Sequence, residues 1–532
     1  MPNDKMRLIY YCSALLLMLI IPRSCQGGNI LVFPTEGSHW VNMEVLIKAL
    51  HSRGHNITIV RSSKSWYIKE NSLYYHTLTV KVDKSLGQEF ISKIVIDVIN
   101  FERGAMPLLQ FLYMNFGMLS IFYEAHSLIA GYVSAILDDQ ALIRSMNDTK
   151  FDILITDPCW GGGTILAKHL DLPLVYNVRW LIGADAHFDI APSPVSYITI
   201  TGSGNTDKMT FLQRVKNMIL YIITQAQNTF VIKLAYQKLC DKYLGPGIDF
   251  YQLMQAADLW LMRVDFVFEF PRPTMPNVVY MGGFHCKPPK PLPAHLEEFV
   301  QSSGDHGVIL MSLGTFVDEL PEDLANAIAG TFAKLPQKVI WRYKGTRPAA
   351  LGNNTLLVDW MPQNDLLGHS RIKLFVAHGG TNGVQEALYH GVPVVGLPLF
   401  FDQYDNLLRL KARGGAKILT VVTVDKDDNF LKAIQEVLHE PSYRMNMKRL
   451  SRLHRDQPMK PLDSALFWIE FVMRHRGANH LRTESYKLPW YSYHAVDVFV
   501  FLTGAVLLMI FTIVIFIRCL CNTVCKRKIK RE

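Results

Sequence analysis

The chain has 532 residues, of which 49% are hydrophobic and 19% are charged, and a formal net charge of +9 at pH 7. This length predicts two or more domains with large cores, and the apolar content is high for a purely soluble enzyme. Six basic residues and one acidic residue between 518 and 532 supply +5 of the charge, so the composition indicates no basic surface for nucleic acid and no nucleic-acid partner is expected.

A secretory signal peptide is predicted for residues 1–27. Lys5 and Arg7 precede an apolar run from residue 8 to residue 21, and small or polar residues follow up to Gly27. A charged start, a short apolar core and a small-residue exit are typical of a cleaved signal, so cleavage is expected near Gly27. An uncleaved signal anchor is the alternative, although the run is short for a membrane span.

The next segment predicts a strand–helix–strand unit. Residues 29–33 form an apolar strand, 34–40 a loop, 41–53 an amphipathic helix and 57–60 a second strand. Such a unit predicts a parallel sheet, in which ligands bind beyond the carboxyl ends of the strands. His39 is expected at that edge of the sheet.

A second polar residue is expected at the same edge. Residues 151–156 predict another strand of this sheet, and Asp157 stands at its carboxyl end. A carboxylate beside an imidazole fixes the ring tautomer and stabilises the cation that forms when the ring takes a proton. His39 and Asp157 are therefore candidate catalytic residues, although either alone would be interpreted as a structural histidine or a helix cap.

Three other segments of this half give less specific predictions of structure or function. Gly161, Gly162 and Gly163 do not complete a dinucleotide-binding pattern and predict close strand–helix packing. Residues 192–217, rich in Ser, Thr, Gly and Pro, predict a mobile loop. The aromatic and Met-rich region from about residue 90 to residue 132 predicts helices whose side chains form hydrophobic core, an apolar acceptor pocket or both. The side chains concerned are Phe101, Leu108, Leu109, Phe111, Tyr113, Met114, Phe116, Met118 and Phe122.

Proline-rich sequence between residues 271 and 293 is predicted to connect this half to a second strand–helix series. Residues 308–312 and 338–342 predict two strands of the second series. The first of them leads directly into a polar loop, and its candidate ligand-binding residues are Ser312, Gly314 and Thr315.

Residues 360–403 contain the most specific pattern. A buried strand at 373–377 runs through a glycine-rich loop into a helix at 384–390, and a further strand at 392–397 follows. Glycines before a helix N-terminus allow a phosphate to approach free backbone N–H groups. The candidate ligand-binding residues are Trp360 and Gln363 for a base, Glu386 for a ribose, His378, Gly379, Gly380, Thr381 and Asn382 for a diphosphate, and Asp402 and Gln403 for a sugar.

This stretch resembles the signature of the UDP-glycosyltransferases, most closely the membrane-bound UDP-glucuronosyltransferases. The positions that match the family spacing are His378, Gly380, Glu386, Pro393, Pro398, Asp402 and Gln403. Ala377 departs from the pattern, which has Ser or Thr there, and this removes one hydrogen bond to phosphate, worth about 0.5–1.5 kcal/mol. The resemblance extends over residues 29–532 and includes the segments that contain His39 and Asp157.

The resemblance implies an α/β fold with two Rossmann-like domains facing across a cleft, of the GT-B type, followed by a C-terminal transmembrane helix. The implied parts after the signal peptide are an acceptor-binding domain at 28–285, a UDP-sugar-binding domain at 286–460, return helices and a juxtamembrane segment at 461–495, the transmembrane helix at 496–517 and a basic tail at 518–532.

The resemblance also implies an inverting transfer of glucuronic acid from UDP-glucuronic acid to a hydroxyl of a small lipophilic acceptor, giving a β-glucuronide. UDP-glucuronic acid is then a co-substrate, and no cofactor or metal is expected. Asp425-Lys426-Asp427 is interpreted as a solvated loop. Arg263 is a candidate partner for the sugar carboxylate. The alternatives are UDP-glucose or UDP-galactose as donor, or a non-catalytic partner that binds a UDP-sugar.

The carboxyl end predicts a single-pass type I membrane protein. Residues 498–517 are uncharged and long enough to cross a bilayer, and the tail beyond them is basic. The positive-inside rule places the tail in the cytoplasm and the rest in the lumen. Lys528 and Lys530 resemble the dilysine retrieval signal of endoplasmic reticulum proteins, with a basic stop-transfer flank as the alternative.

The predicted lumenal body has few cysteines. Only Cys159, Cys240 and Cys286 lie between the signal peptide and the membrane span, which allows at most one internal disulfide. Three N-x-S/T sequences are candidate glycosylation sites, at Asn56, Asn147 and Asn353. Whether the chain forms a homo- or hetero-oligomer stays open.

Overall fold

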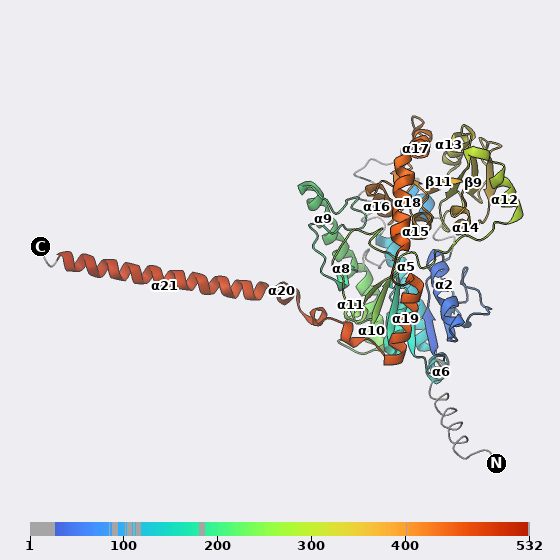
Figure 1. Cartoon of the computed structure of the whole chain (residues 1–532). Helices are drawn as coiled ribbons and strands as arrows, with labels where there is room; N and C mark the ends of the chain where they lie inside the picture. The colour runs from blue at the N-terminus through green and yellow to red at the C-terminus, as the bar shows by residue number, and fades with distance from the viewer. Residues whose placement is uncertain are drawn as a thin grey trace, which may run out of the picture. The chain divides into compact units, whose positions relative to one another are not determined.

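The computed structural model describes residues 27–84, 86–87, 94–99, 101, 103, 109, 112, 119–179, 187–400 and 402–529, with the backbone alone for 524–529. It divides into one unit, Met1–Leu481, and a second unit, Arg482–Glu532. The first unit contains two sheets with the helices that cover them (Figure 1). The predicted signal peptide lies outside the described residues, apart from Gly27.

The first sheet has seven parallel strands in the order β3-β2-β1-β4-β5-β6-β7. Its strands are β1 (Asn29–Phe33), β2 (Asn56–Ser62), β3 (His76–Val80), β4 (Ile153–Thr156), β5 (Leu174–Val178), β6 (Leu259–Met262) and β7 (Val278–Tyr280). The strands predicted near residues 29, 57 and 151 are confirmed as β1, β2 and β4. The strand order reverses between β1 and β4, which is where open α/β sheets place their ligands.

The helices between these strands cover both faces of the sheet. They are α2 (Ser38–Ser52), α5 (Leu119–Asp138), α6 (Gln140–Thr149), α7 (Gly162–His169), α8 (His187–Ile190), α9 (Phe211–Gln227), the π-helix η2 (Asn228–Lys233), α10 (Leu234–Tyr243) and α11 (Phe250–Gln255). Most of the aromatic region near residue 110, including Leu108, Phe111, Tyr113, Met114, Phe116 and Met118, lies outside the described residues. The segment predicted as a loop at 192–217 ends in α9, so its last residues are helical.

The second sheet has six parallel strands in the order β10-β9-β8-β11-β12-β13. Its strands are β8 (Val308–Ser312), β9 (Lys338–Arg342), β10 (Thr355–Val358), β11 (Ile372–Ala377), β12 (Val394–Gly396) and β13 (Ala416–Ile418). Its helices are α12 (Ala294–Gln301), η3 (Gly304–His306), α13 (Glu322–Ala333), α14 (Gln363–Leu367), α15 (Thr381–His390), α16 (Gln403–Ala412), α17 (Asn429–His439) and α18 (Pro441–Arg455). Here the order reverses between β8 and β11, so the predicted glycine-rich loop after β11 stands at the second switch point.

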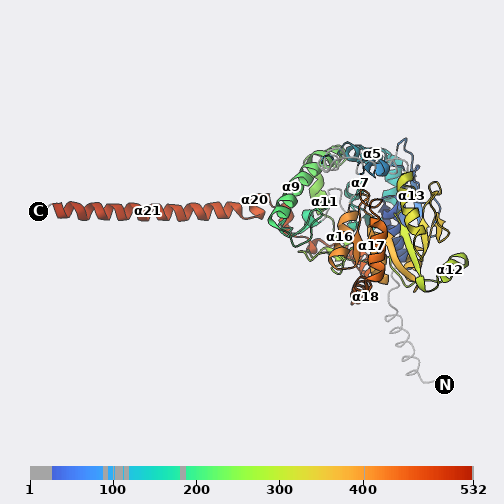
Figure 2. The same ribbon diagram turned by 90° about the horizontal axis from the view of Figure 1, so that it is seen from above.

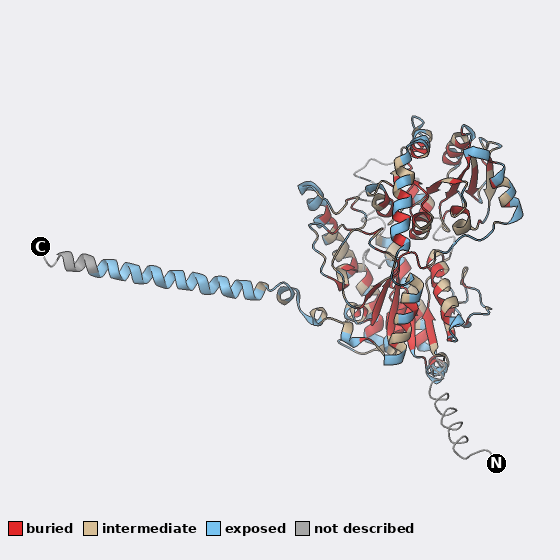
Figure 3. Ribbon diagram, in the orientation of Figure 1, coloured by how far each residue is buried: buried red, intermediate tan, exposed pale blue. Residues whose placement is uncertain are grey.

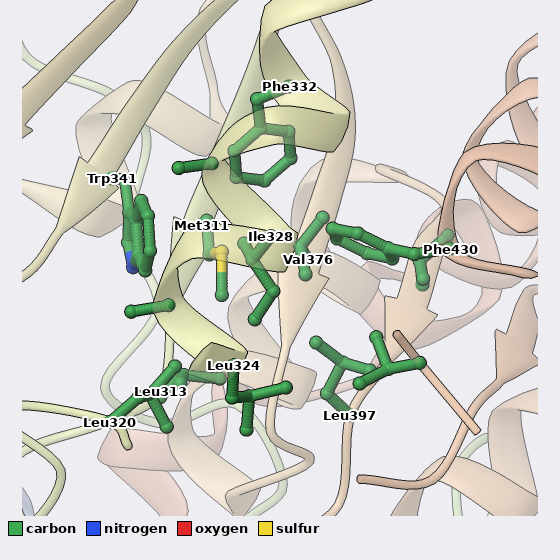
Figure 4. Packing of buried hydrophobic residues seen from close by; sticks show 14 of the residues in the cluster. Met311, Leu313, Leu320, Leu324, Ile328, Phe332, Trp341, Val376, Leu397 and Phe430 are labelled. Carbon is green, nitrogen blue, oxygen red and sulfur yellow. The ribbon is translucent and has the colours of Figure 1, made fainter. Parts of the chain in front are cut away.

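Each sheet is buried on both faces, as its continuous apolar strands require. Figure 3 shows the strands of both domains as the most buried parts of the first unit. On one face of the second sheet, Trp341 packs against Phe332 of α13, and Phe332 in turn packs against Phe430 of α17 (Figure 4). Burial of such large side chains contributes about 1.5–3 kcal/mol each, which holds the strand ends beneath the loops that follow them.

The helix α19 (Pro461–His475) packs against the first domain. Its residues Ala465, Leu466, Ile469 and Val472 are buried in the core formed by β1, β2, β4 and α2. The short helix η4 (Asn479–Leu481) ends this unit. The chain therefore crosses between the domains twice, which restricts how far they can separate.

The predicted start of the helix after β1 is corrected by the structure, and the predicted close packing at the three glycines after β4 is confirmed. The helix after β1 begins at Ser38, three residues earlier than predicted, so His39 lies in its first turn and not in a loop. The prediction of close packing at Gly161–Gly163 is confirmed. A Cβ would lie 2.4 Å from the Phe250 ring at Gly161, 2.6 Å from Val133 at Gly162 and 2.3 Å from Thr156 at Gly163.

The second unit contains η5 (Glu484–Lys487), α20 (Trp490–Tyr493) and α21 (Val496–Ile529). Within α21, the stretch Val496–Thr523 is long and apolar enough to cross a membrane. Figure 2 shows α21 as one continuous helix. Its side chains from Asp497 to Thr523 are exposed (Figure 3). An exposed apolar helix of this length suits a lipid environment, so α21 is a candidate membrane span.

Candidate functional site

The first part of the site is a buried imidazole–carboxylate pair. Nδ1 of His39, at the start of α2, lies 2.6 Å from Oδ2 of Asp157, just beyond β4. Oδ1 of the same carboxylate accepts a hydrogen bond of 2.9 Å from the Cys159 backbone N–H. Both side chains are nearly inaccessible, 6% exposed for His39 and 2% for Asp157. The two residues are 118 positions apart in sequence, and the sheet brings them to one edge, as predicted.

The charges at this pair follow from burial and from the partners. Burial lowers the pKa of His39 below its usual value, and the neighbouring Asp157 only partly offsets this. Burial would raise the pKa of Asp157, but His39 and Arg263 outweigh it, so that pKa is lowered. At neutral pH the imidazole is therefore neutral and the carboxylate ionised. With Nδ1 facing the carboxylate, the ring can accept a proton at Nε2, which is what a general base requires.

The second part of the site is the glycine-rich loop between β11 and α15. Gly379 has a φ of +94°, and a Cβ there would lie 2.4 Å from the Gln403 carbonyl oxygen. A Cβ at Gly314 would lie 2.5 Å from Nε2 of His378, and one at Gly380 would lie 2.4 Å from the same atom. The imidazole of His378 thus lies between two glycines. Burial lowers the pKa of His378 to about 4, so the neutral ring can donate one N–H to a phosphate oxygen.

The predicted base and ribose residues lie together. Nε2 of Gln363, at the start of α14, donates a 2.6 Å hydrogen bond to Oε2 of Glu386 in α15. Burial raises the pKa of Glu386 to about 7. The ring of Trp360 is 62% exposed, which leaves a flat face for a base. This arrangement fits a nucleoside whose ribose hydroxyls contact Glu386.

The predicted sugar residues follow β12. Oδ2 of Asp402 accepts hydrogen bonds from Thr381 Oγ1 at 3.3 Å and Asn406 Nδ2 at 2.8 Å. Oε1 of Gln403 accepts from the backbone N–H groups of Leu399 and Phe400, at 2.8 and 3.2 Å. The side-chain amide N–H groups of Gln403 and the second Asp402 oxygen are the polar groups left to bind a ligand.

A single cavity of about 540 Å³ joins the two parts. This volume is typical of small-molecule sites. The predicted site residues that line it are His39, Ser312, Gly314, Thr315, Trp360, Gln363, His378, Gly380, Asn382, Glu386, Asp402 and Gln403. The Thr315 hydroxyl is buried and has no hydrogen-bond partner among the described residues, so it is available to a ligand.

The two domains touch at the edge of this cavity. Nδ2 of Asn42 in α2 donates a 2.9 Å hydrogen bond to Oδ1 of Asn382 in α15. Nδ2 of Asn382 in turn donates to the Ser38 carbonyl oxygen at 3.3 Å. The N-terminal ends of the two helices therefore face each other, with His39 on one and the glycine-rich loop on the other.

Four predicted site residues are absent from the described lining of the cavity. Asp157 lies behind His39, and Gly379 and Thr381 contribute backbone position and a hydrogen bond to Asp402. Arg263, predicted as a partner of the sugar carboxylate, does not line the cavity. Its side chain is 2% exposed, and its Nη2 lies 3.7 Å from Oδ2 of Asp157.

Arg179, just beyond β5, was missed by the sequence analysis. It lines the cavity, and it donates from Nη1 to the Ser38 hydroxyl. Its positive charge lowers the pKa of both His39 and His378, so its guanidinium lies near both. The signal available in the sequence was its place immediately after the apolar run 174–178, at the carboxyl edge of the sheet.

The same edge of the sheet carries three potential metal ligands. Ligand atoms of His39, Asp157 and Cys159 lie within 4.8 Å of one another. One tetrahedral ion with bonds of about 2.1 Å would hold two ligand atoms about 3.4 Å apart. The 2.6 Å between His39 and Asp157 is instead the length of a hydrogen bond. The three described thiols of the body, Cys159, Cys240 and Cys286, are free.

Comparisons with known proteins agree with this geometry. A family model described as "UDP-glucoronosyl and UDP-glucosyl transferase" matches residues 28–531. The chain is 41% identical to human UDP-glucuronosyltransferase 2A2 over 513 residues, covering 95% of this chain and 94% of that protein. It is 41% identical to mouse UDP-glucuronosyltransferase 2B17 over 521 residues, covering 96% of each.

Solved structures share the fold. The calicheamicin glycosyltransferase CalG4 superposes with a TM-score of 0.55 at 17% identity, covering 84% of this chain and 99% of that one. The glycosyltransferase of kitacinnamycin superposes with a TM-score of 0.54 at 17% identity, covering 84% of this chain and all of that one. The predicted fold, two Rossmann-like domains of the GT-B type, is confirmed.

Proposed function

The chain belongs to the UDP-glucuronosyl and UDP-glucosyl transferase family, and from this premise we propose that it transfers glucuronic acid from UDP-glucuronic acid to a hydroxyl of a small lipophilic acceptor. The observation that carries the proposal is the shared cavity, lined by His39 from the first domain and by His378 and Glu386 from the second. The choice of donor is supported by relatives at 41% identity that are named UDP-glucuronosyltransferases.

The acceptor hydroxyl is activated by the buried pair. His39 takes the hydroxyl proton at Nε2 while the acceptor oxygen forms a bond to the anomeric carbon of the sugar. Asp157, hydrogen bonded to Nδ1 at 2.6 Å, stabilises the imidazolium that results. Attack from the face opposite UDP inverts the anomeric carbon, so an α-linked donor gives a β-glucuronide.

The leaving group is stabilised by the second domain. As the bond between the anomeric carbon and the β-phosphate oxygen breaks, its electron pair stays on UDP. The neutral His378 ring donates a hydrogen bond to the diphosphate, and the backbone N–H groups at the start of α15 add the positive end of a helix dipole. Preorganised donors of this kind contribute about 3–4 kcal/mol each to stabilising the transition state.

Arg179 is the proposed partner of the sugar carboxylate. Its guanidinium lies near both His39 and His378, and the transferred sugar must lie between the base and the diphosphate. Its Nε is buried and has no hydrogen-bond partner within the described part of the chain, so a carboxylate can accept from it. A charged pair of this kind favours glucuronic acid over glucose.

A donor screen tests this function. With labelled UDP-sugars and a phenolic acceptor, kcat/KM for UDP-glucuronic acid should exceed that for UDP-glucose or UDP-galactose. Arg179→Met should lower the glucuronate-to-glucose ratio about tenfold, because a charge-assisted hydrogen bond contributes about 1.5–3 kcal/mol. The control Arg263→Met, which changes a guanidinium outside the cavity, should lower turnover with both donors and keep the ratio. Equal use of UDP-glucose by the wild-type enzyme would contradict the proposed donor.

We further propose that transfer requires no metal ion or cofactor. In the proposed mechanism, His378 and the positive end of the α15 helix dipole stabilise the diphosphate, which a divalent ion would otherwise do. Turnover after dialysis against EDTA should therefore stay within about twofold of the untreated rate, since an essential ion would supply several kcal/mol. Loss of activity that manganese restores would be the opposite result.

The membrane anchor α21 supports a location in which apolar acceptors are abundant. We propose that the protein resides in the endoplasmic reticulum membrane, with the catalytic unit in the lumen and the basic tail in the cytoplasm. Asn56, Asn147 and Asn353 are exposed, which is compatible with glycosylation there. Lys530 of the suggested retrieval signal lies outside the described residues, and so does the Lys528 side chain.

A further inference from the structure

The first-domain part of the cavity, which we term the acceptor arm, has an apolar wall. Phe33 and Val60 from the sheet line it on one side. The side of α5 that faces the cavity supplies the rest, through Ile121, Phe122, Ala125, Leu128, Ile129 and Tyr132. Such a wall fits the body of a lipophilic acceptor. The arm also contains charged residues that an apolar acceptor alone does not explain.

Arg61 is the central charged residue of the acceptor arm. It lies near the end of β2 and is 7% exposed. In the strand register Val32 pairs with Ile59 and Phe33 with Thr156, so Arg61 and Asp157 lie at the same level, on the two strands that flank β1. Two strand spacings separate their backbones by about 10 Å. Arg61 therefore stands roughly one small ligand's length from the catalytic pair.

The guanidinium of Arg61 is poorly satisfied within the protein. Its Nη1 lies 3.5 Å from the Thr79 hydroxyl and 3.6 Å from the Glu70 carboxylate, whose side chain is 64% exposed. Its Nε–H is buried and has no hydrogen-bond partner among the described residues. Leaving a charged donor buried without an acceptor destabilises the folded protein. A ligand that accepts from this edge would remove that destabilisation.

Two other unpaired donors line the same cavity. Tyr132 Oη and Trp66 Nε1 are buried, and neither has a hydrogen-bond partner in the part of the chain that the structure describes. Burial raises the pKa of Tyr132, the Glu36 charge adds to this and the Arg61 charge opposes it, so both charged groups lie near the Tyr132 hydroxyl. Indole and guanidinium N–H groups can only donate hydrogen bonds. A ligand that pairs with them must therefore present a hydrogen-bond acceptor.

The charge of the acceptor arm favours an anion. Arg61, Lys64 and Lys84 line it, against one acid, Glu36. Both Glu36 oxygens already accept hydrogen bonds, Oε2 from the Tyr67 backbone N–H at 3.0 Å and Oε1 from the Ser65 hydroxyl. Glu36 is therefore held in place by its own loop and is not a full counter-ion for Arg61. A carboxylate, which only accepts hydrogen bonds, matches this environment.

We propose that the preferred acceptor is a hydroxy acid: an apolar body whose hydroxyl is presented to His39 and whose carboxylate, at the other end, is bound by Arg61 with Tyr132. This inference rests on the proposed transfer to a hydroxyl and specifies the acceptor class. A carboxylate that bridges Nε and Nη2 of Arg61 makes the bidentate contact that guanidinium groups favour. The acid group is bound and is not the group that receives the sugar.

Three fused-ring probes test the acceptor class with the full-length enzyme in membranes: 6-hydroxy-2-naphthoic acid, its methyl ester and 2-naphthol. With wild-type enzyme and UDP-glucuronic acid, kcat/KM for the acid should exceed that for the ester at least tenfold. Arg61→Met should lower this acid-to-ester ratio about tenfold or more, as expected for loss of a charge-assisted contact. Arg144→Met removes the same charge from the exposed surface of α6 and should keep the wild-type ratio.

Equal use of acid and ester by the wild-type enzyme, or an unchanged ratio in Arg61→Met, would overturn the proposal. If Arg61→Met folds poorly, Arg61→Lys is the alternative test. Lysine keeps the positive charge but cannot make the bidentate contact, so this variant should give an acid-to-ester ratio between those of wild type and Arg61→Met. Binding of the acid without donor, measured by quenching of tryptophan fluorescence, should weaken in Arg61→Met. If no probe accepts any sugar while the acid still binds through Arg61, the proposed transfer fails and the acceptor class stands.

Discussion

His39→Ala is expected to lower kcat for hydroxyl acceptors by about 10³-fold, because a positioned general base contributes about 10²–10⁴ to such reactions. Among the described residues, the His39 imidazole is the ring that lines the cavity next to a buried carboxylate, with its Nδ1 2.6 Å from Oδ2 of Asp157. Without it, the acceptor oxygen must attack while still carrying its proton. Binding of UDP should stay nearly intact, because the groups expected to contact it belong to the second domain.

The measurement is initial-rate kinetics with a saturating phenolic acceptor, together with UDP binding by calorimetry. His126→Ala is a matched control, since it removes an equally buried imidazole, 2% exposed, from α5, and His126 does not line the cavity among the described residues. That control should reduce stability and leave kcat close to wild type. Turnover near the wild-type rate in His39→Ala would end the assignment of His39 as the base.

Asp157→Asn is expected to reduce both turnover and stability. The carboxylate holds His39 in one orientation and lies 3.7 Å from the buried guanidinium of Arg263. An amide cannot stabilise the imidazolium, so kcat should fall by about 10²–10⁴-fold. It also leaves the Arg263 charge, 2% exposed, without its counter-charge, and breaking a buried pair in this way costs about 3–5 kcal/mol.

Thermal unfolding in detergent separates the two effects. Asp157→Asn should unfold at a lower temperature than His39→Ala, because only the former leaves a buried charge uncompensated. The pKa of Asp157 is below its usual value of 3.8, so its ionised form stabilises the fold above that pH and this contribution is lost as the pH falls through the lowered pKa. The difference in unfolding temperature between wild type and Asp157→Asn should therefore become smaller as the pH is lowered. Asp152→Asn, at the exposed position immediately before β4, is the control. It should unfold like wild type, because an amide oxygen can still accept the hydrogen bond from the Asn29 backbone N–H. An Asp157→Asn variant as stable as wild type would contradict a structural role for this charge.

Much of the fold could be predicted because its signals are local. An apolar run of five residues followed by a glycine or a polar loop predicts a buried strand and its carboxyl end, as for β1, β4 and β11. Since parallel strands end at one edge, His39 and Asp157 could be placed together without knowing the strand order. The glycine-rich loop before α15 was equally predictable, because the residue types that allow a phosphate to approach are few.

Other features depend on contacts between distant parts of the chain. The early start of α2, at Ser38, follows from its packing and from the Asn382 contact with the Ser38 carbonyl, 344 positions away. The return of α19 to the first sheet requires an apolar stripe on the helix and a matching gap on the sheet, and only the helix stripe is visible in the sequence. The positions of Arg61, Arg179 and Arg263 relative to the cavity also depend on contacts between distant parts of the chain.

The sequence by itself predicted the strands β1, β2, β4, β8, β9, β11 and β12, the polar residues at several of their carboxyl ends and the C-terminal apolar helix. These features were predictable because hydrophobic periodicity and glycine placement act over a few residues. The tertiary structure alone decided which of three arginines borders the cavity. Arg61 and Arg179 line it, whereas Arg263 does not and lies 3.7 Å from Asp157. A guanidinium at the end of a strand can lie on either side of its sheet or beneath a neighbour, and packing from segments more than 100 residues away selects among these orientations.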